Sequence, residues 1–383
     1  MKDLQRLYRK NLVGNFNEFD LFQTNRERIS RIFKGEILPP YEVLIHPSST
    51  CNLRCLWCIG ENLSEQQKNE RLEEKLRDPE HMIHILKTIL DYKEGSFKTE
   101  NISFSGLLGE PLVFKEATLT GMKYLQEHGI RTGLFTNGLL MDEEVCKVLS
   151  GISYVLISLD AATNRTYCKM KCQGLNQNFN YIKKVTDNIF TLNQVKKKMQ
   201  SNLDINMGYV VNPYNYFEIE QAAGLAKALG VRFFRLKMDI AVKNVLSKEQ
   251  QQAVTAQIAN IKKYLEDDYF HLVEIHSISQ MIDSDQKRLF SQCYINRIFA
   301  AVGSDGCLYA CNYHAKKGGV QFGNLLEENM SDVWKRIGQL EIHQCPRVCD
   351  PYKNRANNML NQAKYLYDTE GEAYLYDLVD HIL

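Results

Sequence analysis

The stretch Cys51-Asn-Leu-Arg-Cys55-Leu-Trp-Cys58 decides how the rest of this sequence is read. It follows YEVLIH at 41–46, an apolar-rich segment with the length of a buried strand. Parallel α/β barrels carry their chemistry at the carboxyl ends of the strands, so we expect a site here. The spacing of the three cysteines allows one short loop to wrap three thiolates around a compact metal core.

Three thiolates leave such a metal core one protein ligand short. A closed cluster or a structural zinc site needs four ligands, and no fourth cysteine follows before Cys146. An open coordination position is what a catalytic metal uses to bind a small molecule. The alternative is a zinc site completed by a distant residue such as His46, although zinc motifs favour Cys-x2-Cys pairs in two halves.

Composition excludes several classes of protein. Among 383 residues, 47 Lys and Arg nearly balance 46 Asp and Glu, which argues against nucleic acid as a partner. No apolar run reaches the roughly 18 residues of a membrane helix, and the charged start MKDLQRLYRK is unlike a secretory signal. We therefore expect a cytoplasmic chain with no membrane partner, whose eleven cysteines are ligands or reactive thiols rather than disulfides.

Strand-like and helix-like segments alternate after the first strand. Apolar runs of buried-strand length lie at 101–106, 131–138, 153–160, 203–211 and 231–238. Helical patterns lie at 79–92, 113–128, 141–150, 176–197, 215–229 and 247–265, the first opened by Asp78 as N-cap and Pro79. This order predicts an α/β fold with a parallel sheet and right-handed crossovers, a partial (β/α)6 TIM-like barrel.

The chain divides into four expected regions. Residues 1–40 form an amphipathic helical extension that ends at Pro39-Pro40, and residues 41–290 form the barrel. Residues 291–352 form a small cysteine-bearing unit with a β-hairpin and a helix, and residues 353–383 form a helical tail.

The pattern Cys-x3-Cys-x-aromatic-Cys after the first strand of a partial barrel resembles the radical S-adenosylmethionine (SAM) superfamily. The resemblance implies that Cys51, Cys55 and Cys58 hold a [4Fe–4S] cluster whose fourth iron is chelated by SAM. It also implies reductive cleavage of SAM to a 5′-deoxyadenosyl radical, which abstracts a substrate hydrogen. Trp57 fills the aromatic slot that packs near the adenine in that family.

Leu108-Gly109-Glu110-Pro111 follows the second strand and resembles the Gly-Gly-Glu-Pro motif that binds the methionine amino group in that family. Glycine permits close backbone approach, and the carboxylate of Glu110 can pair with an ammonium. This chain departs from the pattern at Leu108, where the family has a glycine. An ordinary strand-to-helix turn is the alternative interpretation.

Polar residues at the later strand ends complete the expected SAM site. Asn137 ends the third strand, and Ser158 and Asp160 end the fourth, where the family places groups that contact the ribose. A simple Asn-Gly turn and an Asp N-cap for the next helix are the alternatives. Further candidates for the cavity are Asn212, Asn215 and Lys237.

The C-terminal cysteines form a second group. Cys293 is followed by SDGCLYAC at 304–311, expected as a hairpin that turns at Asp305-Gly306, and the spacing resembles SPASM and twitch domains. That resemblance implies one auxiliary [4Fe–4S] cluster with four ligands, Cys293, Cys311, Cys345 and Cys349. Cys307 is a spare that would replace a wrongly assigned ligand, and a four-cysteine zinc knuckle is the alternative.

The remaining cysteines have simpler interpretations. Four-residue spacing places Cys168 and Cys172 on one helix face, either as small core residues or with Cys168 as a hydrogen-atom donor for an epimerisation. Cys146 is expected in a helix core. His81 and His84 are expected to be surface or packing residues.

The resemblance implies an oxidoreductase-type radical SAM enzyme of the SPASM/twitch subgroup. Its expected substrate is a peptide or a small polyhydroxylated molecule such as a sugar or cyclitol, oxidised or epimerised at an unactivated C–H bond, with a flavodoxin- or ferredoxin-type reductant. The alternatives are a non-catalytic iron–sulfur or zinc-binding scaffold or sensor, and an RNA-modifying radical SAM enzyme, which the near-zero net charge disfavours.

Overall fold

The computed structural model describes residues 18–58, 71–106, 109–239, 246–274, 288, 290–345, 349–373 and 375. The strands of this described part form one sheet of ten, in the order β10-β9-β8-β1-β2-β3-β4-β5-β6-β7. Their bounds are β1 Glu42–Ile45, β2 Asn101–Phe104, β3 Arg131–Thr136, β4 Tyr154–Ser158, β5 Asp204–Val211, β6 Phe233–Met238, β7 His271–Glu274, β8 Phe299–Val302, β9 Cys307–Tyr309 and β10 Gln321–Asn324.

Helices connect the parallel strands, as the alternating pattern predicts. Their bounds are α2 Glu18–Phe33, α4 Pro79–Asp91, α5 Lys115–Glu127, α6 Glu143–Leu149, α7 Asn164–Lys171, α8 Tyr181–Lys198, α9 Ile219–Ala228, α10 Lys248–Asn260, α12 Met330–Trp334 and α13 Pro351–Glu370. The expected cap of α4 is confirmed, because the side chain of Asp78 accepts a hydrogen bond from the backbone N–H of Glu80.

The partial barrel is confirmed, but its sheet is larger than the six strands expected. A seventh parallel strand, β7, pairs with β6. Beyond the other edge, β8 pairs in parallel with β1, and β9 and β10 continue the sheet as antiparallel strands. The C-terminal hairpin is therefore a continuation of the barrel sheet.

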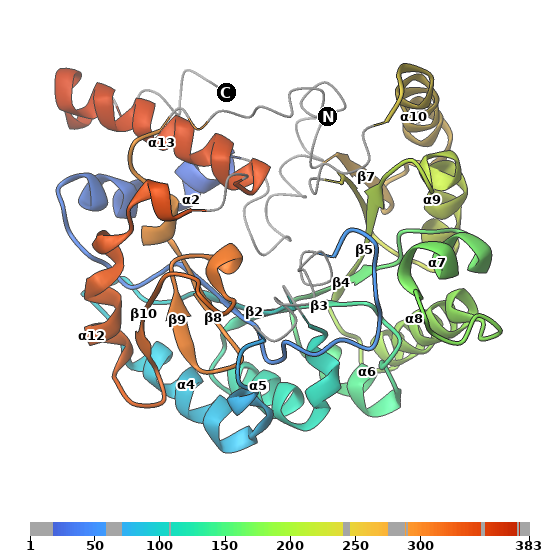
Figure 1. Cartoon of the computed structure of the whole chain (residues 1–383), viewed down its shortest axis with the longest axis horizontal. Coiled ribbons are helices and arrows are strands. Elements are labelled where there is room, and N and C mark those ends of the chain that lie inside the picture. The colour runs from blue at the N-terminus through green and yellow to red at the C-terminus, as the bar shows by residue number, and fades with distance from the viewer. Residues whose placement is uncertain are drawn as a thin grey trace.

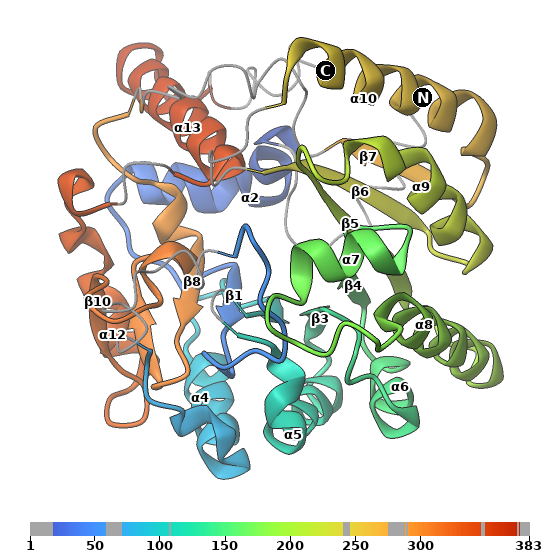
Figure 2. The same cartoon turned by 45° about the vertical axis from the view of Figure 1, so that its right-hand side comes forward.

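The curved sheet gives the molecule the shape of a horseshoe with the helices on its outside (Figure 1). Helices α2 and α13 lie on one arm beside β8, and α9 and α10 lie on the other arm beside β6 and β7 (Figures 1 and 2). The turned view shows β1 and β4 at the centre of the inner face, with α7 in front of β4 (Figure 2).

The two faces of the sheet differ in polarity because side chains alternate along each strand. The outward positions, among them Val43, Ile102, Leu134 and Ile205, belong to the main hydrophobic core with the helices. Many of the inward positions are polar or aromatic, among them Glu42, Ser103, Tyr154, Asn206 and Arg235, all buried.

A second, smaller core joins the two ends of the chain. Phe22, Ile29 and Ile32 of α2 pack with Ala356 and Leu360 of α13. None of the helices among the described residues combines the length and the apolar character needed to cross a membrane.

Candidate functional site: two groups of cysteines on one sheet

The three-cysteine loop, residues 51–58, follows β1 at the carboxyl edge of the parallel sheet. Burial raises the pKa of Cys51 to about 11, and the charges of Glu110 and Cys58 add to the rise. Burial also raises the pKa of Cys55 far above its usual value, with further contributions from Cys58 and Cys51. Like charges act between these thiols, so the structure brings the three cysteines together.

A carboxylate that the motif does not contain fixes the entry to this loop. The Glu74 carboxylate accepts hydrogen bonds from the backbone N–H of Ser49, from its hydroxyl at 3.0 Å and from the hydroxyl of Thr50 at 3.0 Å. Thr50 in turn accepts a backbone hydrogen bond from Glu110 at 2.9 Å. Glu74 is therefore a positioning residue for the strand-to-loop turn.

The far side of the loop is fastened to the end of α7. The backbone N–H of Arg54 donates to the carbonyl of Lys171, and that of Leu56 donates to Met170, both at 2.9 Å. Arg54 also forms an isolated parallel bridge with Cys172. The end of α7 thus holds the loop through two backbone hydrogen bonds and this bridge.

Gly109 and Glu110 lie against the same loop. A Cβ on Gly109 would stand 2.2 Å from the carbonyl oxygen of Ser48 and 2.9 Å from that of Thr50, so only glycine fits. Glu110 is buried and accepts hydrogen bonds from the Thr136 hydroxyl at 2.6 Å and from the backbone N–H of Asn137 at 2.8 Å. Burial raises its pKa, and these hydrogen bonds oppose the rise.

Glu110 also caps the short 3-10 helix Pro111–Phe114, because its carboxylate accepts from the backbone N–H of Leu112. The Gly-Glu-Pro stretch therefore ties the ends of β2 and β3 to the three-cysteine loop. Leu108, where the sequence departs from the family pattern, lies outside the described residues.

Asn137 faces the three-cysteine loop directly. Its amide Nδ2 donates to Oδ1 of Asn52 at 2.7 Å, and its Oδ1 accepts from the backbone N–H of Leu139. Trp57 lies on the same loop, partly exposed, with its ring against the main core. The loop is thus held from three neighbouring strand ends.

Asp160 forms a buried ion pair that the sequence did not suggest. It is buried in a left-handed backbone conformation with φ of 63°, and its carboxylate pairs with the Lys171 ammonium at 2.6 Å. Its second oxygen accepts from the backbone N–H of Val210 at 2.7 Å. The alternative of an N-cap is wrong, because Thr163 caps α7.

Lys171 connects this buried pair to the three-cysteine loop. Burial would lower its pKa, but the charges of Asp160, Tyr167 and Cys55, together with the hydrogen bond to Asp160, hold the pKa above its usual value. The same ammonium donates to the backbone carbonyl of Ser158 at 2.6 Å. Its positive charge acts on both Cys51 and Cys55, favouring their thiolate forms.

The C-terminal cysteine set, Cys293, Cys311, Cys345 and Cys349, comes together from separate chain segments. Burial raises the pKa of Cys293 to about 11, with contributions from Cys311 and Cys345. Burial raises the pKa of Cys349 to about 12, and Cys293 and Cys311 contribute there too. These mutual effects place the four thiols in one neighbourhood.

The spare cysteine lies elsewhere. Cys307 is on β9, where burial and Asp305 raise its pKa to about 12 and the other charges that act on it are those of Lys75 and Glu327. The predicted hairpin turn is confirmed, since Gly306 has φ of 82° and donates to the carbonyl of Gly303.

Asn357 is a site residue that sequence analysis missed. It is fully buried on α13, and its Nδ2 donates to Sγ of Cys293 at 3.1 Å. Its Oδ1 accepts from the backbone N–H groups of Tyr294 and Ile295, both at 2.9 Å. Only the fold brings α13 to Cys293, so no local pattern announces this contact.

The other cysteines lie in the main core. Cys146 is fully buried in α6, as predicted, and Cys168 and Cys172 are buried at and after the end of α7. The pKa of Cys172 is raised by burial, by the charge of Cys168 and by a hydrogen bond with Cys168, so the two thiols are neighbours.

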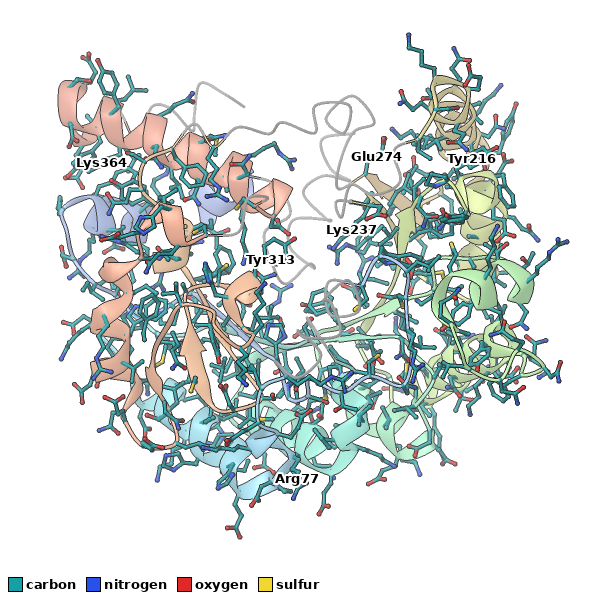
Figure 3. The ribbon with its side chains drawn as sticks, in the orientation of Figure 1. Arg77, Tyr216, Lys237, Glu274, Tyr313 and Lys364 are labelled. Atoms are coloured by element: carbon teal, nitrogen blue, oxygen red, sulfur yellow. The ribbon has the colours of Figure 1, made fainter. Side chains whose placement is uncertain are left out.

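Lys237 stands on the inner face of the sheet, near the end of β6. Lys237 pairs in register with Val210, whose backbone N–H donates to the Asp160 carboxylate. The charge of Asp350, the residue after Cys349, raises the pKa of Lys237, although burial lowers it more. Lys237 on one arm and Tyr313 on the other extend toward the middle of the horseshoe (Figure 3). The other two candidates, Asn212 and Asn215, are buried and hydrogen-bonded within the loop after β5.

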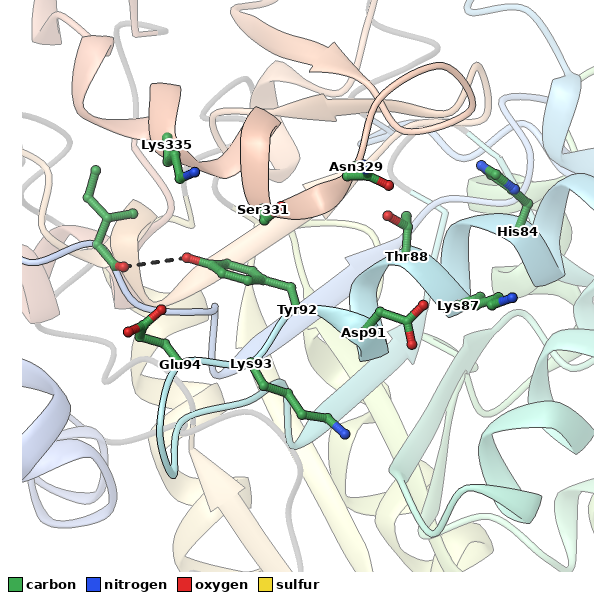
Figure 4. Close-up of a pocket in the computed structure, with 11 residues that line it drawn as sticks. His84, Lys87, Thr88, Asp91, Tyr92, Lys93, Glu94, Asn329, Ser331 and Lys335 are labelled. Carbon is green, nitrogen blue, oxygen red and sulfur yellow. Dashed lines mark hydrogen bonds between the residues drawn. The ribbon is translucent and has the colours of Figure 1, made fainter.

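A pocket of about 670 Å³ lies away from both groups of cysteines, between α4 and α12 (Figure 4). His84, Thr88 and Tyr92 line it from α4 and its end, and the Tyr92 hydroxyl donates to the Ile37 carbonyl at 3.4 Å. His81 contacts the Lys75 carbonyl at 3.0 Å, which fits the packing role predicted for this pair.

The donor set at each place fits an iron–sulfur cluster, whose usual protein ligands are thiolates. In the described part of the chain, no three His, Cys, Asp or Glu side chains converge as ligands of a single metal ion. A cluster needs a wider arrangement, because each thiolate binds a different iron.

His46 is the residue considered above as a distant zinc ligand. Its Nδ1 lies 3.0 Å from the Ser105 carbonyl oxygen, and burial lowers its pKa to about 4.

Comparison with known proteins agrees with this geometry. The model of the radical SAM superfamily matches residues 45–233, which run from the last residue of β1 to the first of β6 and include the three-cysteine loop and the four strands β2 to β5. Fe-coproporphyrin III synthase of Methanosarcina barkeri is 36% identical over 125 residues, 32% of this chain and 28% of that protein.

The cysteine-type anaerobic sulfatase-maturating enzyme of Clostridium perfringens is 31% identical over 137 residues, 32% of this chain and 34% of that enzyme. The matched segment therefore spans about a third of the length of each of these curated relatives.

Solved structures share the fold over most of the chain. Streptococcus suis SuiB bound to the precursor peptide SuiA gives a TM-score of 0.58 at 16% identity, covering 83% of this chain and 70% of that one. Native anSMEcpe with bound AdoMet gives a TM-score of 0.53 at 18% identity, covering 90% of this chain and all of that one.

The chain is an α/β protein with a partial barrel, the fold shared by SuiB and anSMEcpe, and three cysteines lie just beyond its first strand. The family model identifies residues 45–233, about half of the chain, as a radical SAM superfamily domain, and the chain has the fold of SuiB and anSMEcpe.

Proposed function

We propose that this protein is a radical SAM enzyme that oxidises a peptide at an unactivated C–H bond. The observation that carries the proposal is the three-cysteine loop, which brings three thiols together at the carboxyl edge of the sheet. When bound there, a [4Fe–4S] cluster and SAM supply reductive cleavage to a 5′-deoxyadenosyl radical.

The chain's own residues hold and orient these groups. Cys51, Cys55 and Cys58 are the proposed cluster ligands, and Lys171 favours the thiolate forms of Cys51 and Cys55 electrostatically. We assign Gly109 to close backbone approach, because a side chain there would strike the loop. Trp57 is the proposed adenine contact.

The strand ends supply the remaining polar groups of the proposed SAM site. Glu110, with Pro111 after it, and Asn137 meet at the ends of β2 and β3, and Ser158 ends β4. Asp160 acts in this proposal by positioning Lys171 and the loop after β5, since both its oxygens are engaged.

The C-terminal cysteine set is the proposed ligand set of one auxiliary [4Fe–4S] cluster, placing this enzyme in the SPASM/twitch subgroup. Four protein ligands would close that cluster, which suits it to accept an electron from the substrate. Oxidation is favoured over epimerisation because Cys168, the predicted hydrogen-atom donor, is buried in the main core beside Cys172.

A peptide is favoured over a small polyhydroxylated substrate by the solved structures that share this fold. SuiB is seen with its precursor peptide, and anSMEcpe with a Cp18Cys peptide. A flavodoxin- or ferredoxin-type protein is the proposed reductant.

The test is anaerobic iron–sulfur reconstitution followed by addition of SAM and dithionite. We expect 5′-deoxyadenosine from the wild type and none from the Cys51/Cys55/Cys58→Ala variant. Two cysteine-bound tetranuclear clusters require about eight irons per chain, falling to about four in the variant.

Two other results would change the proposed function. Iron near twelve per chain would indicate, at about four irons for each cluster, a second auxiliary cluster. Zinc in place of iron, with no cleavage of SAM, would favour the non-catalytic scaffold or sensor.

A further inference from the structure

Lys237 is a charged side chain for which the proposed chemistry has no use. It lies near the end of β6, two residues after Arg235, so both side chains are on the inner face of the sheet. Its own side chain is partly exposed, whereas Arg235 is fully buried. The ammonium is therefore the cationic group that this strand offers to the interior of the horseshoe (Figure 3).

Two opposing influences act on this ammonium. Burial lowers its pKa to about 8, and repulsion from Arg235 adds to the decrease. The carboxylates of Asp350 and Asp160 pull the pKa upward, yet within the described part of the chain neither forms a salt bridge with Lys237. A cation in this setting gains from an anion that comes into direct contact.

The position of Lys237 suits a substrate better than SAM. The cation that acts on Cys51 and Cys55 is Lys171, which already has Asp160 as its partner. Lys237 is instead influenced by Asp350, which caps α13 directly after Cys349. Its register partner Val210 binds Asp160, which pairs with Lys171 beside the three-cysteine loop, so we place the reacting carbon near this ammonium.

The opposite arm supplies a second group at the same level. Tyr313 lies in the short helix after Cys311 and extends toward the middle of the horseshoe (Figure 3). Its phenol hydroxyl can donate a hydrogen bond. A substrate group held here would meet an ammonium from β6 and a hydroxyl from the other arm (Figure 3).

We propose that Lys237 is a specificity-determining residue that binds a carboxylate of an acidic peptide substrate between the two groups of cysteines. This rests on the proposed function and narrows its substrate class to peptides with a glutamate, an aspartate or the C-terminal carboxylate near the reacting residue.

The test uses the reconstituted full-length protein and follows reductive methylation of Lys237 by mass spectrometry. The probes are a peptide pool with a central glutamate, a matched pool with glutamine, the amidated glutamine pool, and SAM alone. A hydrogen bond to a charged group corresponds to about tenfold or more in binding, so the glutamate pool should slow methylation by about that factor relative to the amidated glutamine pool.

Each arm of the test has a defined meaning. Protection by the glutamate pool supports a side-chain carboxylate, and protection by the free-acid glutamine pool but not its amide supports a terminal carboxylate. Equal labelling with all the peptide pools, or protection by SAM alone, would overturn the proposal.

Variants provide an independent check by fluorescence anisotropy with the protecting pool. Lys237→Met should weaken binding about tenfold, whereas Lys237→Arg and the exposed control Lys183→Met should bind like the wild type. Formation of 5′-deoxyadenosine without peptide is measured in parallel. If the wild type forms none, the proposed function fails, whatever the labelling of Lys237 shows.

Discussion

The two groups of cysteines are built in opposite ways. The three-cysteine loop comes from eight consecutive residues and is held by the backbone of neighbouring strand ends and α7. The C-terminal cysteine set is drawn from segments more than fifty residues apart and is held by an Asn357 side chain on a distant helix. Three thiolates leave room for an exogenous ligand, whereas four close the site around what it binds.

The largest expected effect separates the two roles. In the Cys293/Cys311/Cys345/Cys349→Ala variant, iron should fall from about eight to about four per chain. Formation of 5′-deoxyadenosine without substrate should persist, because the three-cysteine loop remains, while oxidised product is lost. Iron analysis and chromatography of the nucleoside decide this, and loss of SAM cleavage would show that the sites are not independent.

The next effect tests the close packing around the three-cysteine loop. Gly109→Ala places a methyl group against the carbonyls of Ser48 and Thr50, an overpacking that costs about 1–3 kcal/mol. We expect the rate of 5′-deoxyadenosine formation to fall by about tenfold or more. The control is Gly224→Ala on α9, where the added methyl group meets no atom within 4 Å. Equal activity of both variants would refute the close approach.

The third prediction concerns the stability of the sheet that carries both groups of cysteines. Burial raises the pKa of Glu42 on β1 to about 7, whereas an unfolded Glu titrates near 4.5. Between these pH values the unfolded chain loses a proton that the folded chain keeps, so stability falls as pH rises. At pH above 7, Glu42→Gln should therefore be more stable than the wild type by up to about 3 kcal/mol.

Chemical denaturation of the chain before reconstitution, at several pH values, measures this difference. The advantage of Glu42→Gln should disappear as the pH approaches that of an unfolded glutamate. A constant difference across the pH range would contradict the assignment of Glu42.

The smallest expected effect is a change in the reduction potential of the auxiliary cluster proposed at the C-terminal cysteine set. Asn357→Ala removes the donor to Sγ of Cys293, and hydrogen bonds to cluster sulfurs help to set the potential. Without this donor the reduced, more negative form is less stabilised, so the potential of the auxiliary cluster should become lower. Asn361→Ala, which removes a donor to backbone carbonyls only, should leave it unchanged in a spectroscopic redox titration.

Sequence analysis found what is local in this molecule. The strand before Cys51, the cap of α4 and the turn at Gly306 each depend on adjacent residues, and all three are confirmed. Strand β7 was missed because HLVE is short, ends in charge and has a polar start, unlike a buried apolar run.

Residues that act across long distances could not be predicted. Glu74 supports the turn before Cys51 from a segment that carries no motif, and Asn357 reaches Cys293 from α13. The partner of Asp160 is Lys171, a residue that nothing in the sequence distinguishes from other lysines. In each case the contact depends on how the sheet brings distant segments together.

The central claim is that the three-cysteine loop binds a cluster with one iron left for SAM. The most direct measurement is the electron paramagnetic resonance spectrum of the reduced, reconstituted Cys293/Cys311/Cys345/Cys349→Ala variant, recorded with and without SAM. We predict a single cluster signal that changes when SAM is added. A signal that SAM leaves unchanged would contradict the account.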